Sequence, residues 1–385
     1  MRIFAGLILI VGFFYPLKIY SQYKSGAEST NQYFPLLSQY RSIGVVAHAA
    51  SKVGKQHLVD TLLKAGLNVK VVFAPEHGFR GHVEAGMNVS DERDATSGLP
   101  IVSLYGKNKK PTPEQMRELD AMVFDLQDVG VRFYTYVSTL HYVMEACAET
   151  GIPLYLLDRP NPNGDYFDGP ILEPAFRSFV GMHPIPVVYG MTLGELALMI
   201  NGEGWLGQGK KCDLTVIPME GYRHDLIIEL PIKPSPNLPN LQSIRLYPSL
   251  CFFEATPISV GRGTDWPFQV IGAPNPQYGD FTFVPRSIPG AAAKPLHEGK
   301  TCYGMDLRND SLHKRLTLYF LLEFFRRSPH PDLFITSPEF FDKLAGSSSL
   351  RKQLLAGWSE TEIRKSWEVG LQNFANLRKP YLIYP

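Results

Sequence analysis

Between residues 43 and 217, short apolar segments alternate with segments whose apolar residues have helical spacing. The apolar segments cover 43–47, 69–73, 101–104, 121–124, 154–157 and 214–217. Helical segments cover 56–65 and 140–148, and two more begin at Thr112 and Thr192 with residues typical of helix starts. This order predicts β-α-β units, and therefore a largely parallel sheet covered by helices.

Polar side chains follow several of the apolar segments directly. His48 follows the first segment, Glu76 and His77 follow the second, and Asp125 begins a polar run after the fourth. Asp158 and Arg159 follow the fifth in the same way. Because parallel strands end at one edge of a sheet, where such folds bind ligands, we expect these side chains to form a site there.

A proline-rich stretch divides the chain. Residues 231–241 contain four prolines, which exclude a helix or a central strand. With 385 residues, the chain is long enough for two domains. We predict a parallel α/β domain over 40–240 and a smaller α+β domain over 241–385, with helices over 312–327 and from Ser359 to about Leu377.

The first residues have the pattern of a secretory signal peptide. Met1 and Arg2 give a positive start, residues 3–17 form an apolar block, and Ile19-Tyr20-Ser21 resembles a cleavage site. The alternative is a membrane anchor, but the block is shorter than the ~20 residues that span a bilayer. We expect residues 1–21 to be removed, and the mature protein to be periplasmic or extracellular with no membrane span.

Charge and motifs exclude several classes of function. A net charge of +1 argues against nucleic acid as a partner. The GxGxxG match at 202–207 follows a helix instead of a strand, so it does not predict a dinucleotide cofactor. The four cysteines form no CxxC pair. No histidine spacing matches HExxH, so we expect no cofactor and no metal, although His48, Glu76 and Asp125 could still converge as ligands in a metal-dependent hydrolase.

Glu76 is the leading candidate for acid–base chemistry. It lies between Pro75 and a glycine-containing turn, with His77 and Arg80 close in sequence. A carboxyl group in a partly buried cleft can serve as a general acid near neutral pH. The alternative is that Glu76 pairs with Arg80 and only holds the loop.

The segment after the fourth strand has the composition of a sugar site. Asp125, Gln127 and Asp128 are followed by Tyr134 and Tyr136, and carboxylates beside aromatic faces suit hydroxyl groups and C–H faces. The alternative is a structural network in which Asp128 caps a helix and Arg132 neutralises Asp125.

Three arginines are candidates for binding an anionic group of the ligand. Arg80, Arg159 and Arg262 lie in loops, and a guanidinium can meet a carboxylate with two hydrogen bonds. Each could equally belong to an internal ion pair.

Seven ordered motifs together resemble the exo-β-N-acetylmuramidases of the NamZ type. They are FAPEHGFRG (73–81), FDLQDVGVRFYTY (124–136), LDRPNPNG (157–164), HPIPVVYGMTLGELA (183–197), PSPNLP (234–239), FEATPISVGRGT (253–264) and SWEVGLQNFANLRKPYLIYP (366–385). The resemblance covers about residues 40–385. Lys233 and Glu84 depart from the family pattern, which leaves room for an altered substrate preference.

The resemblance implies a Rossmann-like N-terminal domain without a nucleotide, and an active cleft between two domains. The implied reaction is hydrolysis of the β-1,4 bond of a non-reducing terminal N-acetylmuramic acid in a peptidoglycan-derived saccharide. The family's key glutamate falls on Glu76. The expected catalytic group is Glu76 with Asp125 or Asp128, oriented by His77. The expected substrate-binding residues are His48, Arg80, Gln127, Tyr134, Tyr136, Asp158, Arg159, Asn161, Asn237, Glu254, Arg262 and Thr264.

Two routes complete such a reaction once Glu76 has protonated the leaving oxygen. Asp125 or Asp128 could act as nucleophile or base, or the 2-acetamido group of the sugar could attack its own anomeric carbon. A non-catalytic periplasmic glycan-binding protein is the other alternative.

Overall fold

The computed structural model describes residues 23–80, 92–311 and 314–385. The expected signal peptide over 1–21 lies outside these residues, as do Gly81 and Glu84. Within the described ranges, no helix has both the length and the apolar character needed to cross a bilayer.

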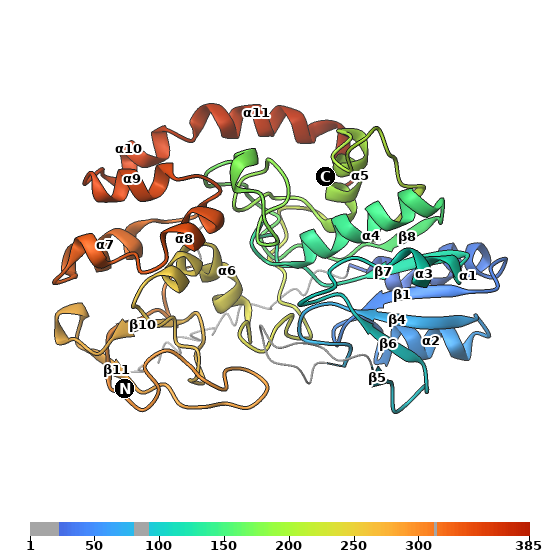
Figure 1. Cartoon of the computed structure of the whole chain (residues 1–385), viewed down its shortest axis with the longest axis horizontal. Helices are drawn as coiled ribbons and strands as arrows, with labels where there is room; N and C mark the ends of the chain where they lie inside the picture. The colour runs from blue at the N-terminus through green and yellow to red at the C-terminus, as the bar shows by residue number, and fades with distance from the viewer. Residues whose placement is uncertain (1–22, 81–91, 312–313) are drawn as a thin grey trace, which may run out of the picture.

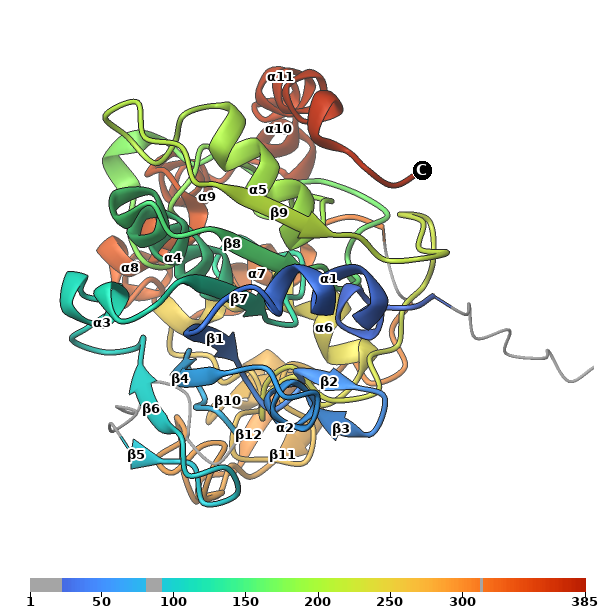
Figure 2. The same ribbon diagram turned by 90° about the vertical axis from the view of Figure 1, so that its right-hand side faces the viewer.

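The N-terminal half is built on a seven-stranded sheet with the order β5-β6-β4-β1-β7-β8-β9 (Figures 1 and 2). Six of the strands run parallel, and β5 pairs antiparallel at one edge. Numbered along the chain, the parallel strands have the order 3-2-1-4-5-6, which is the Rossmann order. The predicted parallel α/β fold is confirmed. The strands are β1 (Ile43–Ala47), β4 (Val69–Ala74), β5 (Glu92–Arg93), β6 (Pro100–Ser103), β7 (Ala121–Asp125), β8 (Leu154–Leu157) and β9 (Leu214–Ile217).

Helices cover both faces of this sheet because successive side chains of a strand point to opposite sides. Val45 and Val123 pack with α1 and α2, whereas Val46 and Phe124 pack with α4 and α5. The helices of this half are α1 (Thr30–Leu37), α2 (Leu58–Lys64), α3 (Pro113–Arg117), α4 (Tyr136–Thr150) and α5 (Leu193–Gly202).

The expected helix ends are largely found. Thr112 and Thr192 each form a capping box, and Gly151 ends α4 in the left-handed conformation. Two boundaries differ from the prediction. Helix α4 begins at Tyr136 instead of Leu140, and Gln56 and His57 form β3 (Gln56–His57), which pairs with β2 (Lys52–Val53).

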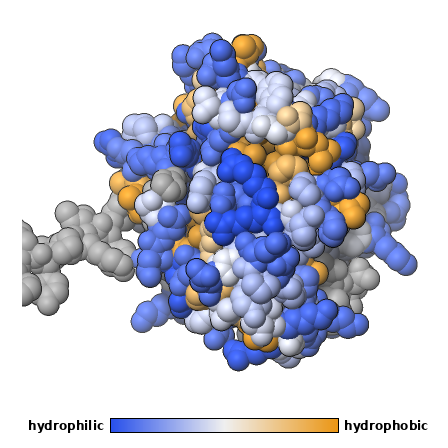
Figure 3. All heavy atoms as spheres, turned by 90° about the vertical axis from the view of Figure 1, so that its left-hand side faces the viewer, coloured by the Kyte–Doolittle hydropathy of each residue, from blue (hydrophilic) through white to orange (hydrophobic). Residues whose placement is uncertain are grey.

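The C-terminal half combines helices with a small antiparallel sheet of order β10-β12-β11, as the α+β prediction required. Its elements are α6 (Leu241–Leu250), β10 (Val270–Ala273), β11 (Phe281–Phe283), β12 (Cys302–Asp306), α7 (Tyr319–Arg327), α8 (Pro338–Ala345), α9 (Ser349–Leu355), α10 (Glu360–Lys365) and α11 (Glu368–Arg378). Across both halves of the chain, short 3₁₀ helices lie at Gly26–Glu28, Pro174–Phe176, Cys251–Ala255, Pro276–Tyr278, Pro331–Leu333 and Lys379–Tyr381. The face of this half shown in Figure 3 is mostly hydrophilic, with separate hydrophobic areas.

Two predicted helices are wrong in extent. Residues 312 and 313 of the helix expected over 312–327 lie outside the described residues. The helix that the structure describes begins only at Tyr319, because side chains from other segments bind the backbone N–H groups of Leu316 and Leu318. The helix expected from Ser359 to about Leu377 is divided into α10 and α11, and the Ser366 hydroxyl donates to the backbone oxygen of Ile363 at the break.

The two halves share one core. The largest cluster of buried apolar side chains runs from Val46 and Phe124 in the sheet to Phe324 and Phe374 in the C-terminal half. Helix α11 crosses back over α5, so that the C-terminal residues lie against the N-terminal half (Figure 1). There, the Tyr384 hydroxyl donates to Asp158 Oδ2 over 2.7 Å.

Candidate active site

Glu76 lies on a tight turn directly after β4. His77 has a φ of 73° and Gly78 a φ of 75°. A positive φ is costly for a residue with a side chain and is often found at functional sites. The Thr135 hydroxyl donates to Glu76 Oε2 over 2.9 Å. Tyr105 also lies beside this carboxylate, and burial together with the Glu76 charge raises the pKa of Tyr105.

Glu76 opens into a pocket that both halves of the chain form. The N-terminal half contributes Glu76, His77, Phe133, Tyr134 and Thr135. The proline-rich segment contributes Ser235, Asn237 and Leu238, and the C-terminal half contributes Tyr247, Arg262 and Phe268. We refer to this space as the Glu76 pocket.

A hydrogen-bonded chain supports the Glu76 turn from behind. The Tyr136 hydroxyl donates to the backbone oxygen of Glu76 over 3.3 Å and lies 3.2 Å from His48 Nδ1. The other ring nitrogen of His48 accepts from the backbone N–H of Gln127 over 2.9 Å. Burial lowers the pKa of His48 well below its ordinary value, so the ring is neutral. His48 and Tyr136 therefore position the turn and do not line the Glu76 pocket.

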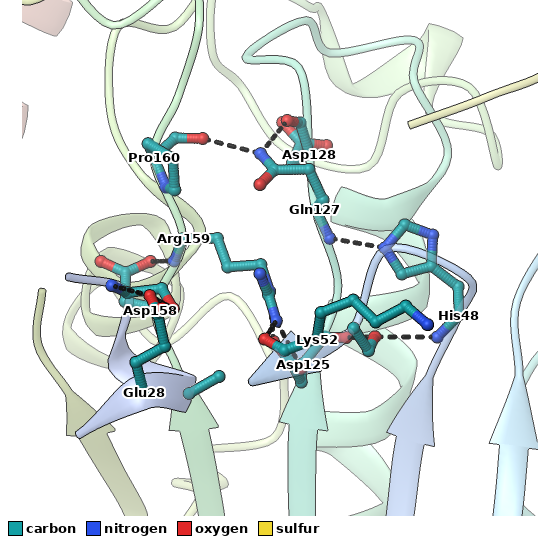
Figure 4. Close-up of polar contacts among 12 residues, drawn as sticks. Glu28, His48, Lys52, Asp125, Gln127, Asp128, Asp158, Arg159 and Pro160 are labelled. Atoms are coloured by element: carbon teal, nitrogen blue, oxygen red, sulfur yellow. Dashed lines mark hydrogen bonds and ion pairs between the residues drawn. The ribbon is translucent and has the colours of Figure 1, made fainter. Parts of the chain in front are cut away.

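Asp125 is buried and paired with Arg159 (Figure 4). Arg159 Nε lies 2.5 Å from Asp125 Oδ1, and Arg159 Nη2 lies 2.9 Å from Oδ2. Arg159 Nη2 also donates to the backbone oxygen of Lys52. Arg159, and not Arg132, is therefore the partner of Asp125. The Arg132 guanidinium instead donates to the backbone oxygens of Pro170, Ile185 and Leu344.

Asp128, which lies three residues after Asp125, is also buried. Its Oδ2 accepts from the Tyr189 hydroxyl and from the backbone N–H of Gly130, so it holds a turn and caps no helix. Its Oδ1 has no hydrogen-bond partner among the described residues. Burial raises the pKa of Asp128 to about 7. Neither Asp125 nor Asp128 lines the Glu76 pocket.

Two expected substrate-binding residues of the next loop have structural partners. Asp158 accepts from the Thr192 hydroxyl and the backbone N–H of Gly194, and so fixes the start of α5. Burial raises the pKa of Asp158 to about 6. The Asn161 side chain donates to the backbone oxygen of Met191. Both residues are buried.

The three arginines occupy different environments. Arg80 binds Asp94 over 2.7 Å and Asp60 over 3.0 Å, so the alternative of an Arg80–Glu76 pair is not found. Arg159 binds Asp125. Arg262 lines the Glu76 pocket and binds Glu254 there over 2.5 Å.

The remaining expected site residues lie as follows. Gln127 donates to the backbone oxygens of Asp128 and Pro160. The Tyr134 hydroxyl donates to the backbone oxygen of Pro234, which ties the Glu76 pocket to the proline-rich segment. Asn237 Nδ2 donates to the backbone oxygen of Ala291. The Thr264 hydroxyl donates to the backbone oxygen of Gly261 and shapes the Arg262 loop.

The sequence did not single out several residues of the Glu76 pocket. Thr135 had a weak signal, because it lies between Tyr134 and Tyr136 in a motif already noted. Ser235 had a similar weak signal within the PSPNLP motif, whereas Tyr247 and Phe268 had none, because no local pattern places them near Glu76. In the described part of the chain, no three His, Cys, Asp or Glu side chains are grouped to hold an ion.

Comparison with known proteins gives the family. The model of the exo-β-N-acetylmuramidase NamZ N-terminal domain matches residues 43–242, and that of the C-terminal domain matches 245–384. The chain belongs to the NamZ family. It is 39% identical over 364 residues to the peptidoglycan β-N-acetylmuramidase NamZ of Bacillus subtilis, covering 89% of this chain and 87% of that protein. Membership makes this protein a glycoside hydrolase.

Two solved structures share the fold. A DUF1343 family protein from Bacteroides fragilis matches with a TM-score of 0.87 and 46% identity, over 94% of this chain and 99% of the other. A second DUF1343 protein from the same organism matches with a TM-score of 0.82 and 28% identity, over 95% and 100%. NamZ relatives and DUF1343 structures therefore describe one architecture that spans nearly the whole chain.

Proposed function

We propose that this protein is an exo-acting β-N-acetylmuramidase that releases non-reducing terminal N-acetylmuramic acid from peptidoglycan fragments, with Glu76 as the general acid. One observation carries the assignment of the acid. Among the described residues that line the pocket between the two halves, Glu76 is the single carboxylate.

In the first step, the Glu76 carboxyl group transfers its proton to the glycosidic oxygen as the bond from that oxygen to the anomeric carbon breaks. Thr135 holds Glu76 Oε2 in place for this transfer. Protonation of the leaving group by a positioned carboxylic acid typically accounts for 10²–10⁴-fold of a rate enhancement.

The residues that line the Glu76 pocket favour the substrate-assisted route, in which the 2-acetamido group of the sugar takes the place of a second catalytic carboxylate. Asp125 is paired with Arg159, and Asp128 is buried away from the Glu76 pocket. The carbonyl oxygen of the 2-acetamido group then bonds to the anomeric carbon, and water opens the resulting ring while Glu76 takes the water's proton. Asn237 is the amide in the pocket that is placed to orient the acetamido group.

The substrate carries a lactyl carboxylate, which requires a cation in the pocket. Arg262 is the arginine that lines it. Glu254 fixes the guanidinium through Nε and Nη2. We assign Arg262 to the lactyl group.

The decisive measurement compares turnover of a chromogenic β-N-acetylmuramic acid glycoside with that of its N-acetylglucosamine counterpart. We expect release from the first substrate only. Glu76→Gln should lower kcat by about 10²–10⁴-fold with unchanged thermal unfolding, while the exposed control Glu118→Gln should match the wild type. Absence of release from both substrates would refute the proposed function and would favour a glycan-binding protein.

Thr135 is a positioning residue in this scheme. Thr135→Ala should lower kcat about tenfold and change KM little, because one hydrogen bond to the acid is lost. Thr135→Ser keeps the hydroxyl and should restore kcat. Equal kcat for the alanine variant and the wild type would remove Thr135 from the mechanism.

Export belongs to the same proposal. It is supported by the charge and apolar pattern of residues 1–21 and by the location of the substrate. Fusion of residues 1–30 to a reporter that functions only after export would test it.

A further inference from the structure

A second hollow lies at the carboxyl edge of the sheet, apart from the Glu76 pocket. Its lining comes from four segments. These are the N-terminal strap (Tyr23, Ser25, Glu28), the turn after β1 (Ala50, Lys52, Gly54, Lys55), the ends of β7 and β8 (Gln127, Arg159, Pro160) and the proline-rich segment (Pro231, Ile232). We refer to it as the rim pocket. Figure 4 shows Glu28, Lys52, Gln127, Arg159 and Pro160 around it.

The rim pocket is suited to an anion. Lys52 and Lys55 line it, and neither has a carboxylate within ion-pair distance among the described residues. Arg159 presents a guanidinium whose side chain is only 10% exposed and already fixed by Asp125. The one carboxylate among the described lining residues is Glu28, so the cations outnumber it. Pro160, Pro231 and Ile232 add an apolar wall.

The chain after β1 argues against a nucleotide as the anion. Dinucleotide-binding Rossmann folds have a glycine-rich turn at this position, which lets the pyrophosphate approach the backbone. Here β1 is followed by His48-Ala49-Ala50-Ser51-Lys52. Lysine and arginine side chains, not a backbone cradle, face the hollow, and they suit a carboxylate.

The rim pocket is close to the Glu76 pocket. The proline-rich segment lines both, with Ile232 in one and Ser235 in the other, and three residues span at most about 11 Å. Gln127 lines the rim pocket, and its backbone N–H binds His48, which in turn contacts Tyr136 below Glu76. A saccharide longer than the sugar being cleaved therefore has a second polar surface within reach.

We infer that the rim pocket is a distal subsite that binds a carboxylate of the same fragment beyond the sugar being cleaved. This inference rests on the proposed function. The carboxylate has two chemical sources in peptidoglycan fragments: the lactyl group of the next N-acetylmuramic acid along the glycan, or a stem peptide. The subsite makes turnover depend on the length or the peptide content of the fragment.

The test uses three substrates with a peptide-free N-acetylmuramic acid at the non-reducing end: a disaccharide, a tetrasaccharide, and a tetrasaccharide that bears a stem peptide on its second N-acetylmuramic acid. The double variant Lys52→Ala/Lys55→Ala should raise KM about tenfold for the plain tetrasaccharide or for the peptide-bearing tetrasaccharide, and leave that for the disaccharide unchanged. Whichever substrate responds identifies the source of the carboxylate. The control Lys64→Ala/Lys70→Ala removes the same charge from exposed positions of the same half.

Equal KM changes for all three substrates, or no change for any, would overturn the subsite. If the wild type cleaves none of them, the proposed function fails, and calorimetric titration of the same three saccharides still decides the subsite. Binding of a longer fragment that weakens about tenfold in the rim variant, but not in the control, supports it. Binding that is equal in all proteins, or absent, refutes it.

Discussion

Glu76, Asp125 and Asp158 each lie at or just after the end of a parallel strand of one sheet, yet their surroundings differ. Glu76 lines a pocket and is held by a hydroxyl. Asp125 is neutralised by a guanidinium, and Asp158 fixes the start of a helix. The sheet thus brings several acids to one edge, and the partners of each acid decide which one can reach a substrate.

Asp128 should make stability depend on pH. Burial raises its pKa to about 7 from an ordinary value of 3.8, so the folded protein holds this proton more tightly than the unfolded chain. The stabilising contribution is full below about pH 4 and is lost as the pH rises to about 7. Asp128→Asn cannot ionise, so its free energy of unfolding should fall by roughly 3 kcal/mol less than that of the wild type between pH 4 and 8.

Urea unfolding at pH 4, 6 and 8 measures this difference. The exposed control Asp213→Asn should follow the wild type. A parallel decline in Asp128→Asn and the wild type would show that Asp128 does not carry the dependence.

At the residue scale, the sequence identified which side chains reach the sheet edge but not their partners. Arg80 shows why. Its partner Asp94 is 14 residues away and Asp60 is 20 residues away, and neither lies in a motif that marks the pair. Pairing depends on tertiary geometry, which local spacing does not contain.

At the scale of helices and strands, a helix boundary could be predicted where neighbouring side chains cap it. The four-residue patterns that begin at Thr112, Thr192 and Ser359 predict helix starts, and each forms a capping box in the structure. The start of α7 could not be predicted in this way, because the side chains of Glu360 and Asp168 bind the backbone N–H groups of Leu318 and Leu316. A side chain from a distant segment can thus displace a helix boundary that periodicity alone would place earlier.

Ser359 allows the strength of one such signal to be measured. Its side chain accepts from the backbone N–H of Glu362 at the start of α10. Ser359→Ala should lower the free energy of unfolding by about 1 kcal/mol. Ser348 stands at the same position of α9 without a side-chain cap bond, so Ser348→Ala should have a much smaller effect. Equal losses in chemical denaturation would show that the cap bond contributes nothing.

At the scale of the whole molecule, the Glu76 pocket exists only because two halves meet. No pattern predicted the strand order, but the parallel sheet and the α+β character of the second half followed from patterns in the chain, and the Rossmann-like character of the first half followed from the family resemblance. The pocket's far wall did not, since Arg262 and Phe268 lie about 190 residues from Glu76. Only the family resemblance pointed to a cleft there.

Tyr384 tests how far the halves are coupled. Its buried hydroxyl donates to Asp158 Oδ2 and accepts from the backbone N–H of Met219. Tyr384→Phe should lower the free energy of unfolding by about 1–3 kcal/mol, because both partners lose a buried hydrogen bond. The loss should occur in a single transition, since the core is shared.

Tyr381→Phe is the matched control. Tyr381 lies in the same tail, but its hydroxyl binds the exposed Glu203, so we expect a loss below about 1 kcal/mol. Two separate transitions in the Tyr384 variant, followed by fluorescence and circular dichroism, would contradict coupling of the halves.

The return of the C-terminal tail to the first half also sets an order of events in biosynthesis. Backbone N–H groups of Ile383 and Tyr384 bind Glu195 in the first turn of α5, and the Tyr384 hydroxyl binds Asp158, which directly follows β8. The N-terminal sheet is made first, but it gains these bonds only when residues 383 and 384 have been synthesised. A chain that stops before residue 383 would lack all three of these bonds.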